Sequence, residues 1–166
     1  MKQHHTARLK RKRLGKTDYR KRLKLLLSNK PRVVVRKSLK NISAQIVEYA
    51  ERGDRVILSS HSSELKKYGW ANNKGNVPAA YLVGLLLGQK AKKKSVKNLI
   101  LDIGLQKSVK GSRIYSLLKG CIDAGLSLPY SKEILPSEDR INGKHINNFD
   151  NSKFEEVKNK ILGVQG

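Results

Sequence analysis

The chain has 166 residues, which fits one domain with short appendages. It carries 36 Lys and Arg against 13 Asp and Glu, and the resulting net charge of +23 repels itself strongly unless a polyanion compensates it. This balance argues against a free metabolic enzyme with a small-molecule substrate, and it favours nucleic acid or an anionic membrane surface as the partner.

Residues 1–16 form a strongly basic arm. Residues 1–40 hold 16 Lys and Arg and a single acid, so about two thirds of the net charge lies in the first quarter of the chain. The arm has too few apolar residues to offset its conformational entropy, so we expect disorder until it binds phosphate; a solubilising tail is the alternative. Its cations are Lys2, Arg8, Lys10, Arg11, Lys12, Arg13 and Lys16.

A helix and three strands are predicted after the arm. Thr17 is the expected N-cap, and Asp18 then places a negative charge in the first turn of the helix. Its apolar face consists of Tyr19, Leu23, Leu26 and Leu27, at helical spacing. Apolar runs at 32–36, 42–49 and 55–59 predict three strands, with a turn at 52–54 before the third.

The middle of the chain changes to helical periodicity. Asn76 is expected to cap a buried helix in which Gly84 and Gly88 allow close approach to a sheet. Residues 99–103 predict a buried strand, and a second helix follows from Ser112 to Gly125. Cys121 lies on the apolar face of that helix, so a core position is favoured over a reactive thiol.

The C-terminal part is polar from residue 131, with a short amphipathic helix predicted from Phe154, Val157, Ile161 and Leu162. The order of three strands, helix, strand and helix indicates an α/β domain with a mixed sheet. We therefore predict a basic arm (1–16), an α/β domain that includes the N-terminal helix (17–130), and a polar C-terminal extension (131–166).

The cysteine count and the length of the apolar runs indicate the compartment of the protein and its relation to membranes. One cysteine excludes an internal disulfide framework and indicates a reducing compartment. The longest apolar run, 77–88, is shorter than the ~20 residues that span a bilayer, and no apolar segment follows the basic N-terminus as in a secretory signal. We expect a cytoplasmic protein, although the basic run 10–13 leaves a nuclear address open.

Motifs for catalysis, metals and cofactors are missing. The histidines His4, His5, His61 and His145 have no metal-ligand spacing, and the basic loop 104–111 lacks the order of a nucleotide-binding loop. The acids that a nuclease would need are Glu64, Asp102 and Asp123, and each has an ordinary capping or hydrogen-bonding explanation. We therefore predict no enzyme activity, no metal and no cofactor.

The signals for binding a polyanion are stronger. Arg32, Arg36, Lys37 and Lys40 cluster on and after the first strand, where arginine forks match phosphate. Tyr19, Tyr68 and Trp70 are candidates for stacking on unpaired bases, and packing in the core explains Trp70 equally well. A chromatin-type DNA protein, and a membrane-surface protein with residues 17–27 as a basic amphipathic helix, remain alternatives.

Several segments together resemble one family. They are 17–26, 30–38, 61–65 (His-Ser-Ser-Glu-Leu), 68–70 (Tyr-Gly-Trp), 75–82, 101–105 and 120–126. In this order they resemble the 5S-rRNA-binding family of large-subunit ribosomal proteins, number eighteen in the universal nomenclature, in its archaeal/eukaryotic form. Leu39 and Asn41 depart from the family pattern, in which Asn and His flank the lysine at 40.

The resemblance implies a ribonuclease-H-like motif without the acids of the nuclease, although an RNA-processing nuclease of that fold stays an alternative. It implies a place in the central protuberance, with 5S rRNA, large-subunit rRNA and a neighbouring 5S-binding protein as partners. The residues predicted to contact RNA are Arg8, Lys10, Arg11, Lys12, Arg13, Lys16, Tyr19, Arg20, Arg22, Arg32, Arg36, Lys37, Ser38 and Lys40.

Overall fold

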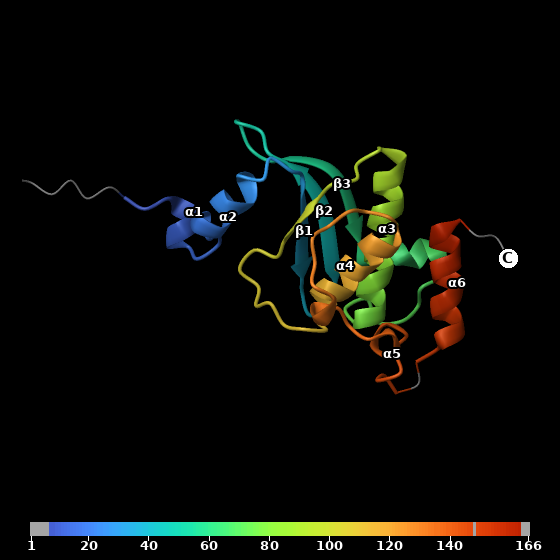
Figure 1. Cartoon of the computed structure of the whole chain (residues 1–166). Coiled ribbons are helices and arrows are strands. Elements are labelled where there is room, and N and C mark those ends of the chain that lie inside the picture. Colours follow the sequence, from blue (N-terminus) through green and yellow to red (C-terminus); the bar gives the residue numbers. More distant parts are fainter. Residues whose placement is uncertain (1–6, 148, 164–166) are drawn as a thin grey trace, which may run out of the picture.

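The computed structural model describes residues 7–147 and 149–163, and Figure 1 shows their layers. A sheet lies between the N-terminal helices on one side and helices α3 and α4 on the other, with α6 beyond them. The helices are α1 (Lys10–Arg13), α2 (Tyr19–Leu26), α3 (Val77–Lys93), α4 (Arg113–Asp123), α5 (Glu138–Ile141) and α6 (Asn151–Leu162), and the 3-10 helices are η1 (Ser62–Tyr68) and η2 (Lys132–Ile134). In the described part of the chain, no helix is long and apolar enough to span a membrane.

The sheet confirms the predicted α/β class with mixed strand directions. Its strands are β1 (Arg32–Lys37), β2 (Ile42–Glu48), β3 (Arg55–His61) and β4 (Ile100–Asp102), in the order β3-β2-β1-β4. β1 pairs antiparallel with β2 and parallel with β4, and β2 pairs antiparallel with β3. Alternation along the strands buries Val33, Val35 and Ala44 against α3 and α4, and leaves the intervening side chains on the opposite face.

Helix α3 is the centre of the core. Its N-terminus is capped as predicted, because the Asn76 Oδ1 accepts a hydrogen bond of 2.9 Å from the Ala79 amide. Residues 77–88 are all buried, since this helix packs on the sheet with one side and on α4 and α6 with others. The second predicted helix is also confirmed as α4, and Gly125 follows it with a φ of 93°.

The close approach predicted between Gly84, Gly88 and a sheet occurs instead between two helices. A Cβ at Gly84 would lie closer than 3.0 Å to the carbonyl oxygen of Leu117 within α4, and a Cβ at Gly88 would lie closer than 3.0 Å to the Cβ of Ala124, the C-cap of α4. Gly120 makes the reciprocal approach from α4 to the Tyr81 carbonyl. The glycines therefore set the distance between α3 and α4, which is the interface with the most contacts in the fold.

The C-terminal segment, predicted as a polar extension from residue 131, contributes side chains to the core. The predicted final helix is present as α6, and it buries Phe154, Val157 and Ile161 against α3 and η1. Trp70 is buried with ring centroids 6.0 Å from Phe149 and 6.4 Å from Phe154. These contacts show that Trp70 packs in the core and is not available to stack on an unpaired base.

The N-terminal helix differs in two details from its prediction. Asp18, and not Thr17, is the N-cap of α2, because its carboxylate accepts from the amides of Arg20 and Lys21. The predicted apolar face is not buried either, since Leu23 is 60% and Leu27 73% exposed. Of the four residues of this face, only Tyr19 and Leu26 are partly buried.

Candidate nucleic-acid interface

The described part of the basic arm contains one turn of helix where the sequence predicts disorder. Helix α1 buries no side chain, so only local hydrogen bonds stabilise it. After α1, Gly15 turns the chain with a φ of 60°, and the Arg11 Nε donates to the Thr17 Oγ1 at 2.9 Å. The predicted cations Arg8, Lys10, Arg11, Lys12, Arg13 and Lys16 are all exposed, whereas Lys2, His4 and His5 lie outside the described residues.

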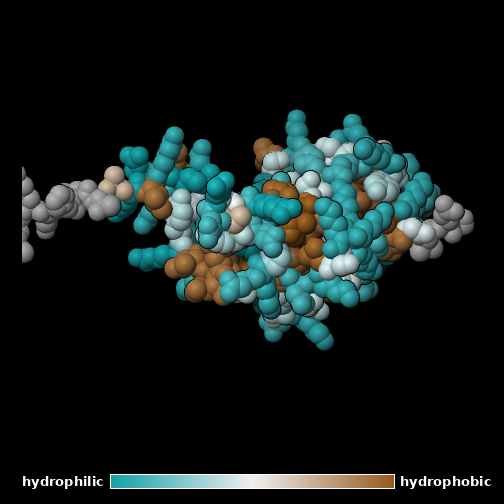
Figure 2. All heavy atoms as spheres, turned by 90° about the horizontal axis from the view of Figure 1, so that it is seen from above, coloured by the Kyte–Doolittle hydropathy of each residue, from teal (hydrophilic) through white to brown (hydrophobic). Residues whose placement is uncertain are grey.

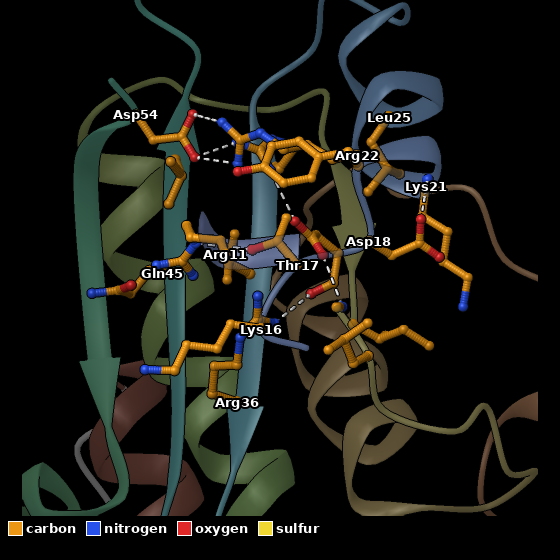
Figure 3. A pocket seen from close by; sticks show the side chains of 18 of the residues that line it. Arg11, Lys16, Thr17, Asp18, Lys21, Arg22, Leu25, Arg36, Gln45 and Asp54 are labelled. Carbon is orange, nitrogen blue, oxygen red and sulfur yellow. Dashed lines mark hydrogen bonds and ion pairs between the residues drawn. The ribbon is translucent and has the colours of Figure 1, made fainter. Parts of the chain in front are cut away.

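A groove of about 940 Å³ separates this basic segment from the sheet face that α3 and α4 leave uncovered (Figure 3). Side chains of the arm and α2 form one wall, among them Lys16, Tyr19 and Arg22. The floor comes from the four strands of the sheet, because strand alternation directs every second side chain to this face. Its residues include Val34, Gln45, Val47 and Val56.

The groove carries an excess of positive charge. Of its three acids, Asp18 accepts hydrogen bonds from backbone amides as the N-cap of α2, while Asp54 and Asp102 are paired with arginines. The cations outnumber these acids, and several reach solvent around the opening. The lining cations are Arg11, Lys16, Lys21, Arg22, Lys24, Arg32 and Arg36.

Asp54 connects α2 to the sheet at one end of the groove. The two guanidinium nitrogens of Arg22 donate to its two oxygens at 2.7 and 2.9 Å, and Arg32 donates to the second oxygen at 2.8 Å. Burial favours the neutral acid, but the hydrogen bonds and charges of both arginines outweigh it and lower the pKa of Asp54. Asp54 is therefore a carboxylate shared by two elements at neutral pH.

Arg32 has a different role from the predicted phosphate contact. Only 1% of the residue is exposed, and its guanidinium donates to Asp102 at 2.8 Å and to Asp54 at 2.8 Å. A guanidinium whose forks are taken by two carboxylates in the protein interior has no free edge for phosphate. This arrangement makes Arg32 an internal ion-pair residue.

The remaining predicted residues fall into two groups. Tyr19, Arg22 and Arg36 line the groove together with Arg11 and Lys16, while Arg20 is exposed beside it on α2. A second group is exposed at the turn between β1 and β2 and does not line the groove: Lys37, Ser38 and Lys40. The Ser38 Oγ there donates to the Asn41 carbonyl and accepts from its amide, and Arg113 donates to the Ser38 carbonyl. The predicted set is therefore distributed over two surfaces.

Lys21, Lys24 and Gln45 line the groove but were not among the predicted contacts. Strand alternation does place Gln45 opposite the buried Ala44 and Ile46. For the lysines of α2, periodicity separates an apolar face from a polar one, but it does not say which face meets the sheet. That choice depends on the pairing of Arg22 with Asp54.

The acids considered for catalysis have structural partners. Glu64 forms a capping box with His61 and pairs with Lys90 at 2.6 Å, and Asp123 accepts from the Tyr81 hydroxyl at 2.9 Å. Across residues 7–147 and 149–163, no three His, Cys, Asp or Glu side chains group as metal ligands. Complete burial raises the pKa of the Cys121 thiol to about 12, which agrees with the predicted core position.

Acid is expected to weaken the fold through Asp54. Because its pKa is lower in the folded than in the unfolded protein, its contribution to stability is complete above the unfolded value of 3.8 and is lost as pH falls through the folded value. The difference in free energy of unfolding between the wild type and Asp54→Asn should therefore be constant above about pH 5 and shrink below 3.8. Urea unfolding between pH 2.5 and 7 measures it, and a difference independent of pH would contradict the assignment.

Comparisons with known proteins agree on one family. Residues 3–98 and 89–131 match the family model described as ribosomal large subunit proteins 60S L5 and 50S L18. The chain is also 52% identical over 148 residues to the large ribosomal subunit protein uL18 of Methanococcus maripaludis, and the match covers 89% of this chain and 77% of that protein.

Proposed function

Because the chain belongs to the family of ribosomal large subunit proteins 60S L5 and 50S L18, we propose that it binds 5S rRNA and helps attach it to the large rRNA in the central protuberance. As a member of this family, it is a structural constituent of the large ribosomal subunit and not an enzyme, as the sequence predicted. Its partners are accordingly ribosomal RNA and ribosomal proteins. To these general partners the proposal adds three specific points: the RNA is 5S rRNA, it binds to the basic arm and the groove, and the protein partner is a neighbouring 5S-binding protein.

The observation that carries the proposal is the continuous basic surface of the arm and the groove. The arm presents exposed cations that no described acid neutralises, and they continue into a groove in which arginines pair with Asp54 and Asp102. Such a surface gains free energy by replacing the counterions condensed on closely packed phosphates. In the proposed complex, the arm lies between RNA helices, and α2 and the strand ends contact the backbone of 5S rRNA.

The proposed contact residues follow from exposure and position. Arg32 is removed from the predicted set because it is buried, and Arg22 is removed because both of its terminal nitrogens donate to Asp54. Lys21 and Lys24 join the set because they line the groove. The half-buried Tyr19 offers the groove a ring on which an unpaired base can stack. The proposed set is Arg8, Lys10, Arg11, Lys12, Arg13, Lys16, Tyr19, Arg20, Lys21, Lys24, Arg36, Lys37, Ser38 and Lys40.

Deletion of residues 1–16 is expected to weaken binding to 5S rRNA and to make it less dependent on salt. Each phosphate contact that is lost should reduce the slope of log affinity against log salt by roughly 0.7–0.9. Filter binding of labelled 5S rRNA between 50 and 300 mM KCl measures both quantities. An unchanged affinity and slope would contradict the role of the arm.

A matched pair of triple variants separates position from charge. Glutamine at Arg11, Lys12 and Arg13 should reduce affinity and slope, whereas glutamine at Lys132, Lys153 and Lys160 removes the same charge far from the groove and should change both much less. Competition with duplex DNA and with unrelated folded RNA at equal salt tests the choice of 5S rRNA. Equal competition by duplex DNA would favour the chromatin-type alternative and would refute the proposal.

A further inference from the structure

The contact between the basic segment and the rest of the domain depends on very few groups. Helix α2 buries none of its side chains, and Tyr19, Leu25 and Leu26 are only partly covered. Within the described chain, the hydrogen bonds that join residues 7–30 to the rest of the domain are the two from Arg22 to Asp54. The position of α2 over the sheet therefore rests mainly on one bidentate ion pair.

We propose that Asp54 is a positioning residue that orients α2 and the basic arm for RNA binding while it contacts no RNA itself. This inference rests on the proposed function. We call the group of Arg22, Asp54 and Arg32 the Asp54 latch. Its two ends differ in burial, since the partly exposed Arg22 belongs to α2 and the buried Arg32 to the inner strand β1.

The geometry of the Asp54 latch fixes the orientation of α2 relative to the sheet. Arg32 is buried and also bound to Asp102 of β4, so the guanidinium that holds Asp54 is itself fixed by two strands. Asp54 in turn accepts one hydrogen bond from each terminal nitrogen of Arg22. Such a bidentate pair fixes the orientation of the two side chains as well as the distance between them. Figure 3 shows Asp54 and Arg22 joined at one end of the groove, with Lys16 and Arg36 further along it. The latch thus sets the angle at which the arm leaves the sheet.

If Asp54 positions α2, its loss should weaken binding to RNA, whereas the change in net charge alone predicts tighter binding. Replacing Asp54 with asparagine removes one negative charge from a protein of +23, so electrostatics alone predicts tighter binding to RNA. Without the latch, however, the orientation that binds is populated less, and the apparent affinity falls by the same factor. Asparagine has one carbonyl oxygen and an NH₂ donor, so it does not offer the pair of acceptor oxygens to which the two nitrogens of Arg22 donate.

The test compares two latch variants with a charge-matched control. Asp54→Asn is expected to weaken binding to 5S rRNA about fivefold, equivalent to ~1 kcal/mol, with an unchanged salt slope. Arg22→Gln breaks the latch from its exposed side and leaves Arg32 paired with Asp54 and Asp102, so it covers the case in which Asp54→Asn unfolds. Lys21→Gln removes the same charge from the same helix, and it should weaken binding less than Arg22→Gln.

A measurement on the free protein separates the latch from the proposed function. Spin labels at Lys12→Cys and Lys132→Cys report the distance between arm and domain, and the native Cys121 is buried. The distance distribution should broaden in both latch variants and stay narrow in Lys21→Gln. An unchanged distribution, or folded Asp54→Asn that binds 5S rRNA as tightly as the wild type, overturns the latch. A wild type with no preference for 5S rRNA overturns the proposed function, and the distances still decide the latch.

Discussion

Replacing Arg32 with methionine is expected to lower the free energy of unfolding by about 3–5 kcal/mol. Arg32 donates to Asp102 and to Asp54 at 2.8 Å, and its side chain is almost completely inaccessible to water. Methionine fills similar space, but it leaves two carboxylates close together without their shared cation. Since domains are stable by only ~5–15 kcal/mol, this single change removes a large part of the total.

Urea unfolding at pH 7 measures the effect, with Arg36→Met as the matched control. Arg36 is four residues further along the same strand, but it is exposed and donates only to backbone carbonyls. Its loss should cost at most ~1 kcal/mol. Combining Arg32→Met with Asp102→Asn should recover part of the lost stability, because one unpaired charge is removed as well. Equal costs for the two arginines would show that the buried network is unimportant.

A methyl group at Gly84 is expected to destabilise the fold by about 3 kcal/mol. Its Cβ would lie within 3.0 Å of the Leu117 carbonyl oxygen, and a backbone atom of α4 cannot rotate away as a side chain does. Alanine is the better helix former by roughly 0.5–1 kcal/mol, so propensity alone predicts the opposite sign. Thermal and urea unfolding of Gly84→Ala therefore distinguish packing from propensity.

Gly88 offers an internal control for this interpretation. A Cβ there meets the Cβ of Ala124, which is a side-chain atom and is removable by mutation. Gly88→Ala should destabilise, and the double variant with Ala124→Gly should recover much of the loss. No change at Ala124 should restore Gly84→Ala. Recovery in both cases would mean that α4 shifts freely, against the close packing proposed for α3 and α4.

The sequence predicted local structure well where one element carries its own signal. The strands at 32–36, 42–49 and 55–59, the cap at Asn76 and the final helix around Phe154 are all confirmed, because alternation, capping side chains and helical spacing act within a few residues. The family was also predicted, since its motifs are read directly from residue order. The accumulation of charge in the first 40 residues likewise requires no coordinates.

The candidate site was predicted less completely. Arg32 and Arg36 look alike in sequence, on one face of one strand, yet one is buried between acids 22 and 70 residues away and the other reaches solvent. Lys21 and Lys24 were missed because helical spacing does not reveal which side of α2 faces the sheet. Trp70 had two equal explanations until Phe149 and Phe154 were found beside it.

By itself, the sequence therefore determined the class of partner, the order and type of the elements, and the family. The tertiary structure alone decided which charged side chains are exposed, which pair with one another, and which helix the glycines of α3 approach. The physical reason is the distance along the chain over which each kind of interaction acts. Capping and periodicity act over a few residues, whereas burial and the pairing of buried charges depend on groups that only the folded chain brings together.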